Sequence, residues 1–212
     1  NEKSLEHYAK EVNLYLTKLI EAEFSIVSKL ECEFEKIYDQ IFFSQTRSGE
    51  GGAKKRYIGQ TQGELDFVGV EFIRSDWTQL AKDFQKQLFE RFFNDETLEH
   101  FIKEYINSLK AGLFDDLLVY TKRLSKPPNE YVKNIPVHVK AALKMQTPKF
   151  GRIKEVKYIM TKQGPEPIEL NPQSIDYEHY IEKQLKPIAN DILHSQNQSF
   201  DGFILGDQLS FL

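Results

Sequence analysis

The chain has 212 residues, of which 40% are hydrophobic, enough to build the core of one large domain or of two small ones. Its apolar runs are much shorter than the roughly 18 residues of a membrane-spanning helix, and its start carries no export signal. We therefore expect a folded, soluble, cytoplasmic protein. The single cysteine, Cys32, excludes an internal disulfide, and its place in an alternating run predicts a small buried side chain.

Charge is distributed unevenly along the sequence. The formal net charge is −4, which, if spread evenly, would disfavour a polyanionic partner. Residues 119–163, however, contain eleven basic residues and two acidic ones, a net charge of +9, so the rest of the chain carries −13. Such segregation predicts a bipolar molecule with one face turned towards a polyanion such as nucleic acid.

The first third of the sequence predicts a helix followed by a small antiparallel sheet. Apolar residues recur at spacings of three and four from Ser4 to about Glu23, which is typical of an amphipathic helix. The period then changes to two, and glycine-containing turns separate the later alternating runs. The predicted strands are 30–34, 41–43, 54–61 and 65–73. We expect these strands to form a meander that the first helix backs.

The rest of the sequence predicts core helices and a loop-rich basic region. One helix is expected to begin at the capping sequence from Ser75 to Thr78 and to continue to Phe92, and a second spans Thr97 to Gly112. Prolines divide the basic region into short elements. The further predicted elements are a strand at 120–124, a helix at 136–145, a strand at 152–160 and a helix at 176–194. Pro187 predicts a kink in the last helix.

The strand that contains Lys54-Lys55-Arg56-Tyr57 is a candidate nucleic-acid contact. Alternate residues on a strand face opposite ways, so one basic side chain can reach a phosphate while Tyr57 reaches the edge of a groove. Taken alone, three adjacent basic residues are more often a solvated surface. The segments around this strand supply the context that favours nucleic acid.

Seven segments, in chain order, resemble motifs of the family B DNA polymerases. They are 30–35 (LECEFE), 54–59 (KKRYIG), 69–77 (GVEFIRSDW), 120–131 (YTKRLSKPPNEY), 135–142 (IPVHVKAA), 153–163 (IKEVKYIMTKQ) and 175–187 (IDYEHYIEKQLKP). The resemblance therefore spans nearly the whole chain. Residues 120–124 and the loop 163–167 are most similar to the bacterial DNA polymerase II branch of the family.

The resemblance implies an α+β fold: an antiparallel segment of the palm sheet with a backing helix, followed by a mainly helical thumb with short strands. The implied domains are the C-terminal part of the palm at 1–73, the thumb at 74–206 and a clamp-binding tail at 207–212. For the parent enzyme, the resemblance implies a DNA-directed DNA polymerase with a 3'-5' exonuclease and Mg2+, acting in replication or repair at the bacterial nucleoid.

The sequence lacks the two aspartate motifs that bind the catalytic metal ions in this family, and we interpret the chain as beginning just after the second of them. We therefore expect no polymerase or exonuclease activity, no catalytic residue and no cofactor in this chain alone. Glu31, Glu33 and Glu35 share one face of a predicted strand. The resemblance makes Glu33 and Glu35 auxiliary acidic candidates, and a solvated face is the alternative. The histidines lack metal-ligand spacing, so we expect no structural metal.

The resemblance also implies contacts with three partners, one of which is the remainder of the polymerase chain. Primer-template duplex DNA would be held through its phosphates, without a reading of its sequence. The candidate residues are Lys54, Lys55, Arg56, Tyr57, Lys122, Arg123, Lys126, Arg152, Lys154 and Lys157. The sliding clamp would receive the apolar tail in a preformed pocket. Its candidate ligands are Gln208, Leu209, Phe211 and Leu212, and the alternative is that this tail packs on the thumb.

Two other classes of function compete with this interpretation. A stand-alone interaction module would use its helices and tail to dock partners and its basic region for solubility, with weak binding to DNA. A small hydrolase built on the paired glutamates would need a nucleophile or a metal cluster, and we find neither in the sequence.

Overall fold

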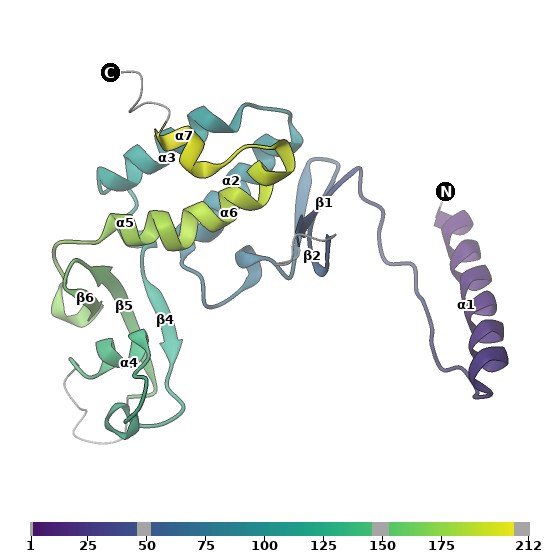
Figure 1. The fold of residues 1–212 in the computed structure, drawn as a ribbon, viewed down its shortest axis with the longest axis horizontal. Coiled ribbons are helices and arrows are strands. Elements are labelled where there is room, and N and C mark those ends of the chain that lie inside the picture. Colours follow the sequence, from purple (N-terminus) through teal and green to yellow (C-terminus); the bar gives the residue numbers. More distant parts are fainter. Residues whose placement is uncertain (1, 46–51, 146–152, 206–212) are drawn as a thin grey trace. The chain divides into compact units, whose positions relative to one another are not determined.

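The computed structural model describes residues 2–45, 52–145 and 153–205. The chain divides into two compact units, residues 1–38 and residues 39–212, which we call the first and the second unit and describe separately. In Figure 1 the first unit is purple, and the second unit continues from blue to yellow.

The first unit is a helix followed by an irregular segment. The helix α1 spans Glu2–Phe24, as the apolar spacing predicted. Residues 25–38 form no strand, so the predicted strand at 30–34 is wrong. The described part of this unit offers no strand to pair with; instead the side chain of Asn13 bonds both backbone groups of Cys32, each at 2.7 Å. Without a sheet to cover it Cys32 is exposed, which corrects the prediction of a buried side chain.

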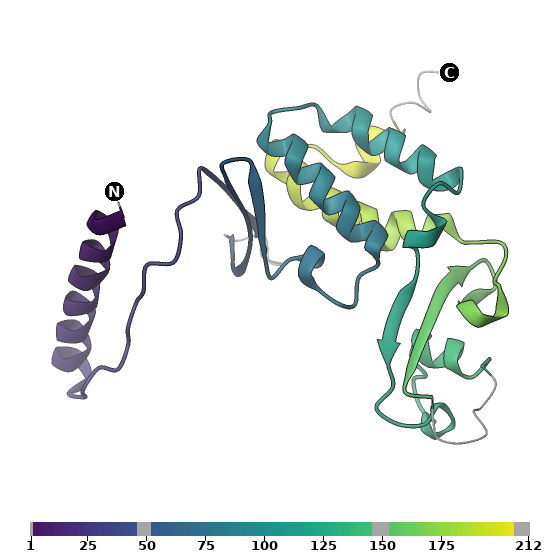
Figure 2. The same cartoon turned by 180° about the vertical axis from the view of Figure 1, so that it is seen from behind.

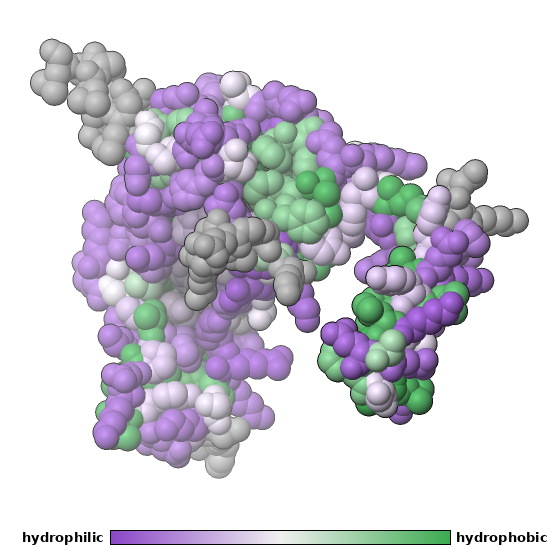
Figure 3. Space-filling model, turned by 45° about the vertical axis from the view of Figure 1, so that its right-hand side comes forward, coloured by the Kyte–Doolittle hydropathy of each residue, from purple (hydrophilic) through white to green (hydrophobic). Residues whose placement is uncertain are grey.

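The apolar stripe of α1 is exposed within the first unit. Tyr8, Val12 and Leu19 are all exposed, and Figure 3 shows hydrophobic and hydrophilic residues side by side on this helix. Because α1 and the predicted sheet belong to different units, the packing of the helix on the sheet stays a prediction.

The second unit begins with the predicted antiparallel meander. Its strands, in the order β1-β2-β3, span Gln40–Gln45, Gly52–Thr61 and Glu64–Val68. Phe42, Ile58 and Phe67 are paired across the sheet and therefore share one face. On this face the ring of Phe42 lies 5.3 Å from that of Phe89 and 5.5 Å from that of Phe92, measured between ring centroids. The sheet thus packs one face on the helix that carries those two phenylalanines.

The third strand is shorter than the sequence predicted. It ends at Val68 rather than Ile73, because Gly69 has a φ of +66°, which turns the chain out of the sheet. A single 3-10 turn, Glu71–Ile73, follows. Glu71, the first residue of this turn, is buried and contacts Arg56 of β2 and Gln85 of the following helix.

A group of helices forms the core of the second unit. The helices α2 and α3 span Gln79–Phe93 and Leu98–Lys110, and begin directly after Thr78, from the predicted capping sequence, and Thr97, the predicted start of the second helix. The side chain of Thr78 accepts a hydrogen bond from the N–H of Ala81, and that of Thr97 forms no capping bond. The C-terminal helices are α5, Tyr177–Tyr180; a π-helical turn, Ile181–Leu185; α6, Lys186–Leu193; and α7, Phe200–Leu205. Figures 1 and 2 show α2 and α3 gathered with α6 and α7. Fully buried aromatic side chains, among them Phe84, Phe89 and Phe200, fill the space between them.

The predicted irregularity at Pro187 takes the form of the π-helical turn just before it. Proline has no N–H, so the helix cannot form the usual bond to the carbonyl four residues earlier. The N–H of Lys186 instead donates to the carbonyl oxygen of Ile181, five residues back. The helix therefore continues through the proline by widening one turn.

A second antiparallel sheet carries much of the basic region. Its strands, in the order β4-β5-β6, span Tyr120–Arg123, Glu155–Thr161 and Gly164–Pro167, and α4 covers Val137–Ala142. Figure 1 shows this sheet and α4 below the group of helices. The remaining 3-10 turns are Asp115–Leu117, Pro128–Glu130, Ile168–Leu170 and His194–Gln196. The predicted α+β class is confirmed, and within the described ranges every helix is too short or too polar to cross a membrane.

Candidate nucleic-acid interface

The basic strand predicted at 54–57 lies in β2, and its side chains have different environments. The side chain of Lys54 lies outside the described part of the structure, and that of Lys55 is exposed. Arg56 forms an ion pair of 2.7 Å with Glu71, whose side chain is only 10% exposed. Tyr57 is half-buried, and its ring lies 5.8 Å from that of Phe43. Of the described basic side chains here, Lys55 is the one directed into solvent.

Arg56 is held by a buried polar network. Glu71 accepts a second hydrogen bond, of 3.0 Å, from the side-chain amide of Gln85 on α2, and Gln85 in turn accepts one of 2.6 Å from the N–H of Phe72. Removing one partner from such a buried pair leaves the other charge uncompensated. Arg56 thus links β2, through Glu71 and Gln85, to α2, and nothing in the local sequence distinguishes it from the neighbouring basic residues.

Gly69 lies in close contact with the backbone of β2 at Lys55. A Cβ atom at this residue would lie 1.9 Å from the carbonyl oxygen of Lys55, far inside van der Waals contact. The backbone of Lys55 can therefore approach Gly69 only because no side chain is there. This close approach sets the position from which Lys55 projects.

A second cluster of predicted contacts lies on β4 and β5. Thr121 pairs with Lys157 and Arg123 with Glu155, so these four side chains share one face of the sheet, and all four are exposed. The side chain of Arg123 is 91% exposed, and its 3.9 Å approach to Glu155 is a weak surface pair. Arg123 and Lys157 are therefore available to a polyanion on this face.

Lys122 faces the opposite side of the same sheet. It pairs with the buried Val156. Burial is the main cause that lowers the pKa of His138, and the charge of Lys122 lowers it further. The hydrogen bond from Arg74 is the main cause that lowers the pKa of Asp76, and the charge of Lys122 also contributes. Lys122 thus lies near both groups. Arg74 donates two hydrogen bonds to Asp76, at 3.0 and 2.8 Å. The proximity of Asp76 and His138 to Lys122 depends on the tertiary fold, so no local pattern in the sequence could have predicted it.

The remaining candidate contacts are dispersed. The ammonium group of Lys126 lies over the ring of Tyr131, 4.6 Å from its centroid, and donates to the carbonyl of Glu130 at 2.8 Å. This group therefore already has two partners within the protein. Lys154 is exposed just before β5. Arg152 and the predicted clamp-binding residues lie outside the described residues. The latter are Gln208, Leu209, Phe211 and Leu212.

The acidic candidates do not form a metal site. Glu33 and Glu35 are both exposed in the irregular segment of the first unit, not on a common strand face. Among the described residues, no group of three or more histidine, cysteine, aspartate or glutamate side chains is placed to hold a metal ion. The acidic residues of the described ranges therefore do not fit a Mg2+ centre of the two-metal type.

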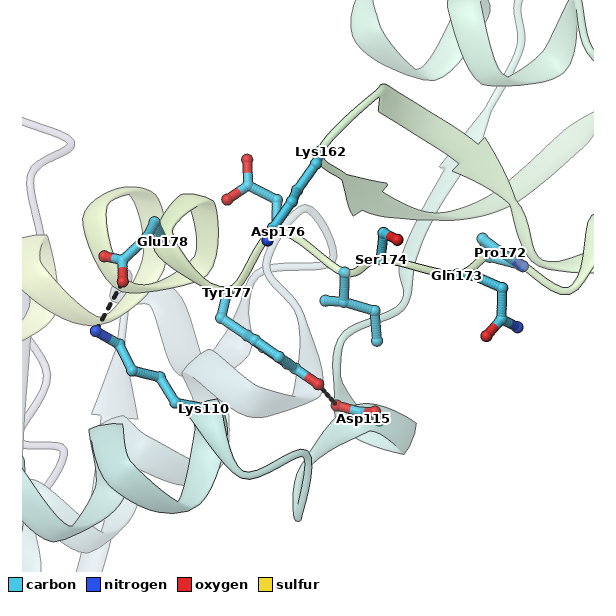
Figure 4. Close-up of a pocket in the computed structure, with 10 residues that line it drawn as sticks. Lys110, Asp115, Lys162, Pro172, Gln173, Ser174, Asp176, Tyr177 and Glu178 are labelled. Atoms are coloured by element: carbon cyan, nitrogen blue, oxygen red, sulfur yellow. Dashed lines mark hydrogen bonds and ion pairs between the residues drawn. The ribbon is translucent and has the colours of Figure 1, made fainter.

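A polar cavity of about 630 Å³ lies where α3 ends and the segment 172–178 begins. Figure 4 shows two interactions between its side chains: Lys110 pairs with Glu178 at 2.7 Å, and the hydroxyl of Tyr177 donates to Asp115 at 3.0 Å. Because these two interactions join α3 and the turn after it to α5, we assign the cavity to the connection between these helices.

Comparison with known proteins decides the family. The family model described as DNA polymerase family B matches residues 6–196. This chain belongs to DNA polymerase family B. DNA polymerase II of Escherichia coli K12 is 37% identical over 193 residues, which cover 85% of this chain and 25% of the relative. DNA polymerase 2 of Aeropyrum pernix is 33% identical over 84% of this chain and 22% of that protein.

A solved structure agrees with this family assignment. The family B DNA polymerase from Pyrobaculum calidifontis matches with a TM-score of 0.59 and 29% identity, over 84% of this chain and 24% of that one. The resemblance found in the sequence and the predicted fold class are thereby confirmed. The chain spans about a quarter of the length of these relatives, so the activity and partners of a whole polymerase enter below as proposals.

Proposed function

We propose that this chain is the part of a DNA-directed DNA polymerase that holds primer-template duplex through phosphate contacts and tethers the enzyme to a sliding clamp. Membership of family B carries the proposal. The concentration of positive charge in residues 119–163, with Arg123 and Lys157 exposed on one sheet face, supports it. In the proposal, residues 1–73 are palm, residues 74–206 are thumb and residues 207–212 are the tail.

The parent enzyme would add deoxynucleotides to a primer 3' end, with Mg2+ held by residues outside this chain and with a separate 3'-5' exonuclease. The residues of this chain would position the primer and not take part in the chemistry, so the chain alone would be inactive. A location at the bacterial nucleoid belongs to the same proposal. The competing interaction module differs in that its basic region would bind DNA weakly.

Duplex binding by the purified chain is expected to weaken steeply with salt. Each neutralised phosphate releases counterions, and each contact contributes about −0.9 to the slope of log K against log salt concentration. With about five contacts we expect a slope of about −4 or steeper, measured by fluorescence anisotropy on a blunt duplex of random sequence. A flat titration would contradict the proposal, and equal slopes on duplexes of unrelated sequence would support backbone contact.

Deleting residues 208–212 is expected to abolish binding to a bacterial sliding clamp and to leave the duplex dissociation constant unchanged. The tail would supply apolar anchors to a pocket and Gln208 a directed amide, so little affinity would remain without them. Surface-immobilised clamp measures the loss, and a chain with the same five residues in scrambled order is the matched control. Clamp binding that survives the deletion, or that the scrambled tail retains, would rule out this tether.

A further inference from the structure

The side chain of Tyr180, in α5, connects two strands of the second sheet to the helices. It is fully buried. Its hydroxyl accepts a hydrogen bond of 2.8 Å from the N–H of Met160 in β5 and donates one of 3.0 Å to the carbonyl of Leu118, two residues before β4. A tyrosine hydroxyl has one hydrogen to donate, so its donor and an acceptor position are both used by the backbone of the sheet.

The ring of Tyr180 is held in place by its neighbours. It stacks on the ring of Tyr120, the first residue of β4, with centroids 5.7 Å apart, and meets the ring of His179 edge-on at 5.4 Å. The hydroxyl of Tyr120 lies 3.1 Å from Nε2 of His179, a second link between β4 and α5. The position of the Tyr180 hydroxyl is therefore fixed by packing as well as by its two hydrogen bonds.

The strands β4 and β5 separate at this hydroxyl. Tyr120 pairs with Tyr158, so Leu118 would stand opposite Met160 if the pairing continued by two residues. Instead, β5 changes partner: the N–H of Asp176 donates to the carbonyl of Met160 at 3.0 Å, and the next residue of β5 pairs with Ile175. In Figure 1 the sheet extends from α5 away from the group of helices. The separation point, which we call the fork, is thus where the sheet meets α5.

The hydroxyl of Tyr180 takes the place of a bond of the sheet. Bonded and non-bonded pairs alternate along antiparallel strands. Leu124 donates to the carbonyl of Lys154 at 2.8 Å, so every second pair from there is a bonded one, and the position of Leu118 opposite Met160 belongs to this series. A continued ladder would join the N–H of Met160 directly to the carbonyl of Leu118. The hydroxyl lies between these two groups and bonds to both.

The basic side chains of the sheet lie along both strands from the fork. Arg123 is five residues beyond Leu118 and Lys157 is three residues before Met160, which places them about 17 and 10 Å along the strands. A rotation of about 10° at the fork would move Arg123 by about 3 Å. That displacement is as long as a charge-assisted hydrogen bond, so it is sufficient to break a contact with a phosphate.

We infer that Tyr180 is a positioning residue for duplex binding: its hydroxyl holds β4 and β5 apart at the fork and so sets the direction of the basic side chains on both strands. The inference rests on the proposed function, because the role that it assigns lies within the grip on DNA. Tyr180 itself is buried and touches no nucleic acid. Without the hydroxyl, Leu118 and Met160 would be left unpaired or would bond directly, and either change alters the angle of β4 at the fork.

Tyr180→Phe tests the inference, because phenylalanine keeps the ring and its stacking and removes only the hydroxyl. We expect the duplex dissociation constant to rise roughly tenfold, in the range of couplings carried by packed networks. Loss of at least one phosphate contact should also make the salt slope shallower by about 0.9 or more. Fluorescence anisotropy gives both quantities at a temperature where circular dichroism shows the variant to be folded.

Tyr105→Phe is the matched control. The hydroxyl of Tyr105 is also buried, and it lies 3.3 Å from the carbonyl oxygen of Leu80 and 3.1 Å from a carboxylate oxygen of Asp83, so it connects α3 to α2 and not to the sheet. Its removal leaves buried polar groups without a partner, as in Tyr180→Phe. We expect a comparable fall in melting temperature, with the dissociation constant within about twofold of the unaltered chain and the same salt slope.

A second background separates positioning from general destabilisation. Arg123→Ala combined with Lys157→Ala removes two of the contacts through which Tyr180 would act. In that background Tyr180→Phe should weaken duplex binding by no more than about threefold, because fewer contacts remain to be displaced. An effect that came from destabilisation alone would be the same in both backgrounds.

The possible outcomes are distinct. If the unaltered chain shows no salt-dependent binding, the proposed function fails and this inference with it. If the unaltered chain binds, and Tyr180→Phe changes the dissociation constant and slope no more than Tyr105→Phe does, the inference alone fails. An equal loss from Tyr180→Phe with and without Arg123 and Lys157 would also overturn it, because the hydroxyl would then not act through those side chains.

Discussion

Gly69→Ala is expected to lower the free energy of unfolding of the second unit by at least about 3 kcal/mol. Two costs combine at this position. The φ of +66° is unfavourable for any residue with a Cβ, and that Cβ would lie 1.9 Å from the carbonyl oxygen of Lys55. Because the obstructing atom belongs to the backbone of β2, relief requires the strand to move, which would also strain the ion pair between Arg56 and Glu71. Urea unfolding followed by circular dichroism measures the loss.

Gly63→Ala is the matched control. Gly63 also has a positive φ, +82°, but a Cβ there would have no atom within 4 Å. Its substitution carries the conformational cost alone, about 1 kcal/mol. The difference between the two variants therefore isolates the close approach of Gly69 to β2. Equal losses would show that this approach is relieved without cost, and the account of how Lys55 is positioned would be wrong.

The sequence predicted the helices and the meander because their signals are local. Apolar residues at spacings of three and four, with the capping sequence that ends at Thr78, define α2 and α3 within a few residues. The turn at Gln62-Gly63 has two residues of positive φ, which is the geometry that a tight hairpin requires. Such features depend on a few neighbouring residues, so one sequence is sufficient to find them.

The strand at 30–34 was not predictable on the same basis. Its alternating pattern satisfies the local requirement for a strand, but a strand also needs a partner to bond with its backbone. In the first unit the side chain of Asn13 instead forms hydrogen bonds with the backbone N–H and carbonyl of Cys32. A period of two describes which side chains could share a face, and it does not supply the neighbouring strand.

The sequence predicted the candidate site as a group of basic residues. In the fold, members of this group have different partners and lie on different faces of the sheets. Arg56 looked equivalent to Lys55 in sequence, but it is paired with a glutamate fifteen residues later. Lys122 and Arg123 are adjacent, and the register of β4 against β5 sends them to opposite faces. Distinguishing these residues needs the tertiary partner of each one, which charge and spacing do not specify.

Removing four exposed or half-exposed charges from the second sheet is expected to cause the largest loss of DNA binding. The variant replaces with alanine Lys122, Arg123, Lys154 and Lys157. If each contacts one phosphate, the salt slope becomes shallower by about 3.6. Counterion release at 0.1 M salt, relative to 1 M, then predicts an affinity for duplex lower by roughly 10³ to 10⁴-fold. Fluorescence anisotropy over a range of salt concentrations gives both quantities in one experiment.

A control of equal charge distinguishes local contact from overall electrostatics. It replaces with alanine four lysines outside the basic region, Lys10, Lys18, Lys29 and Lys86. Both variants have the same net charge, so long-range repulsion of DNA is matched between them. If phosphates are held at the second sheet, the control keeps most of the affinity and nearly the whole slope. If both variants lose affinity equally, the basic region acts as a diffuse field, as the competing interaction module would require, and the proposed grip on duplex DNA is wrong.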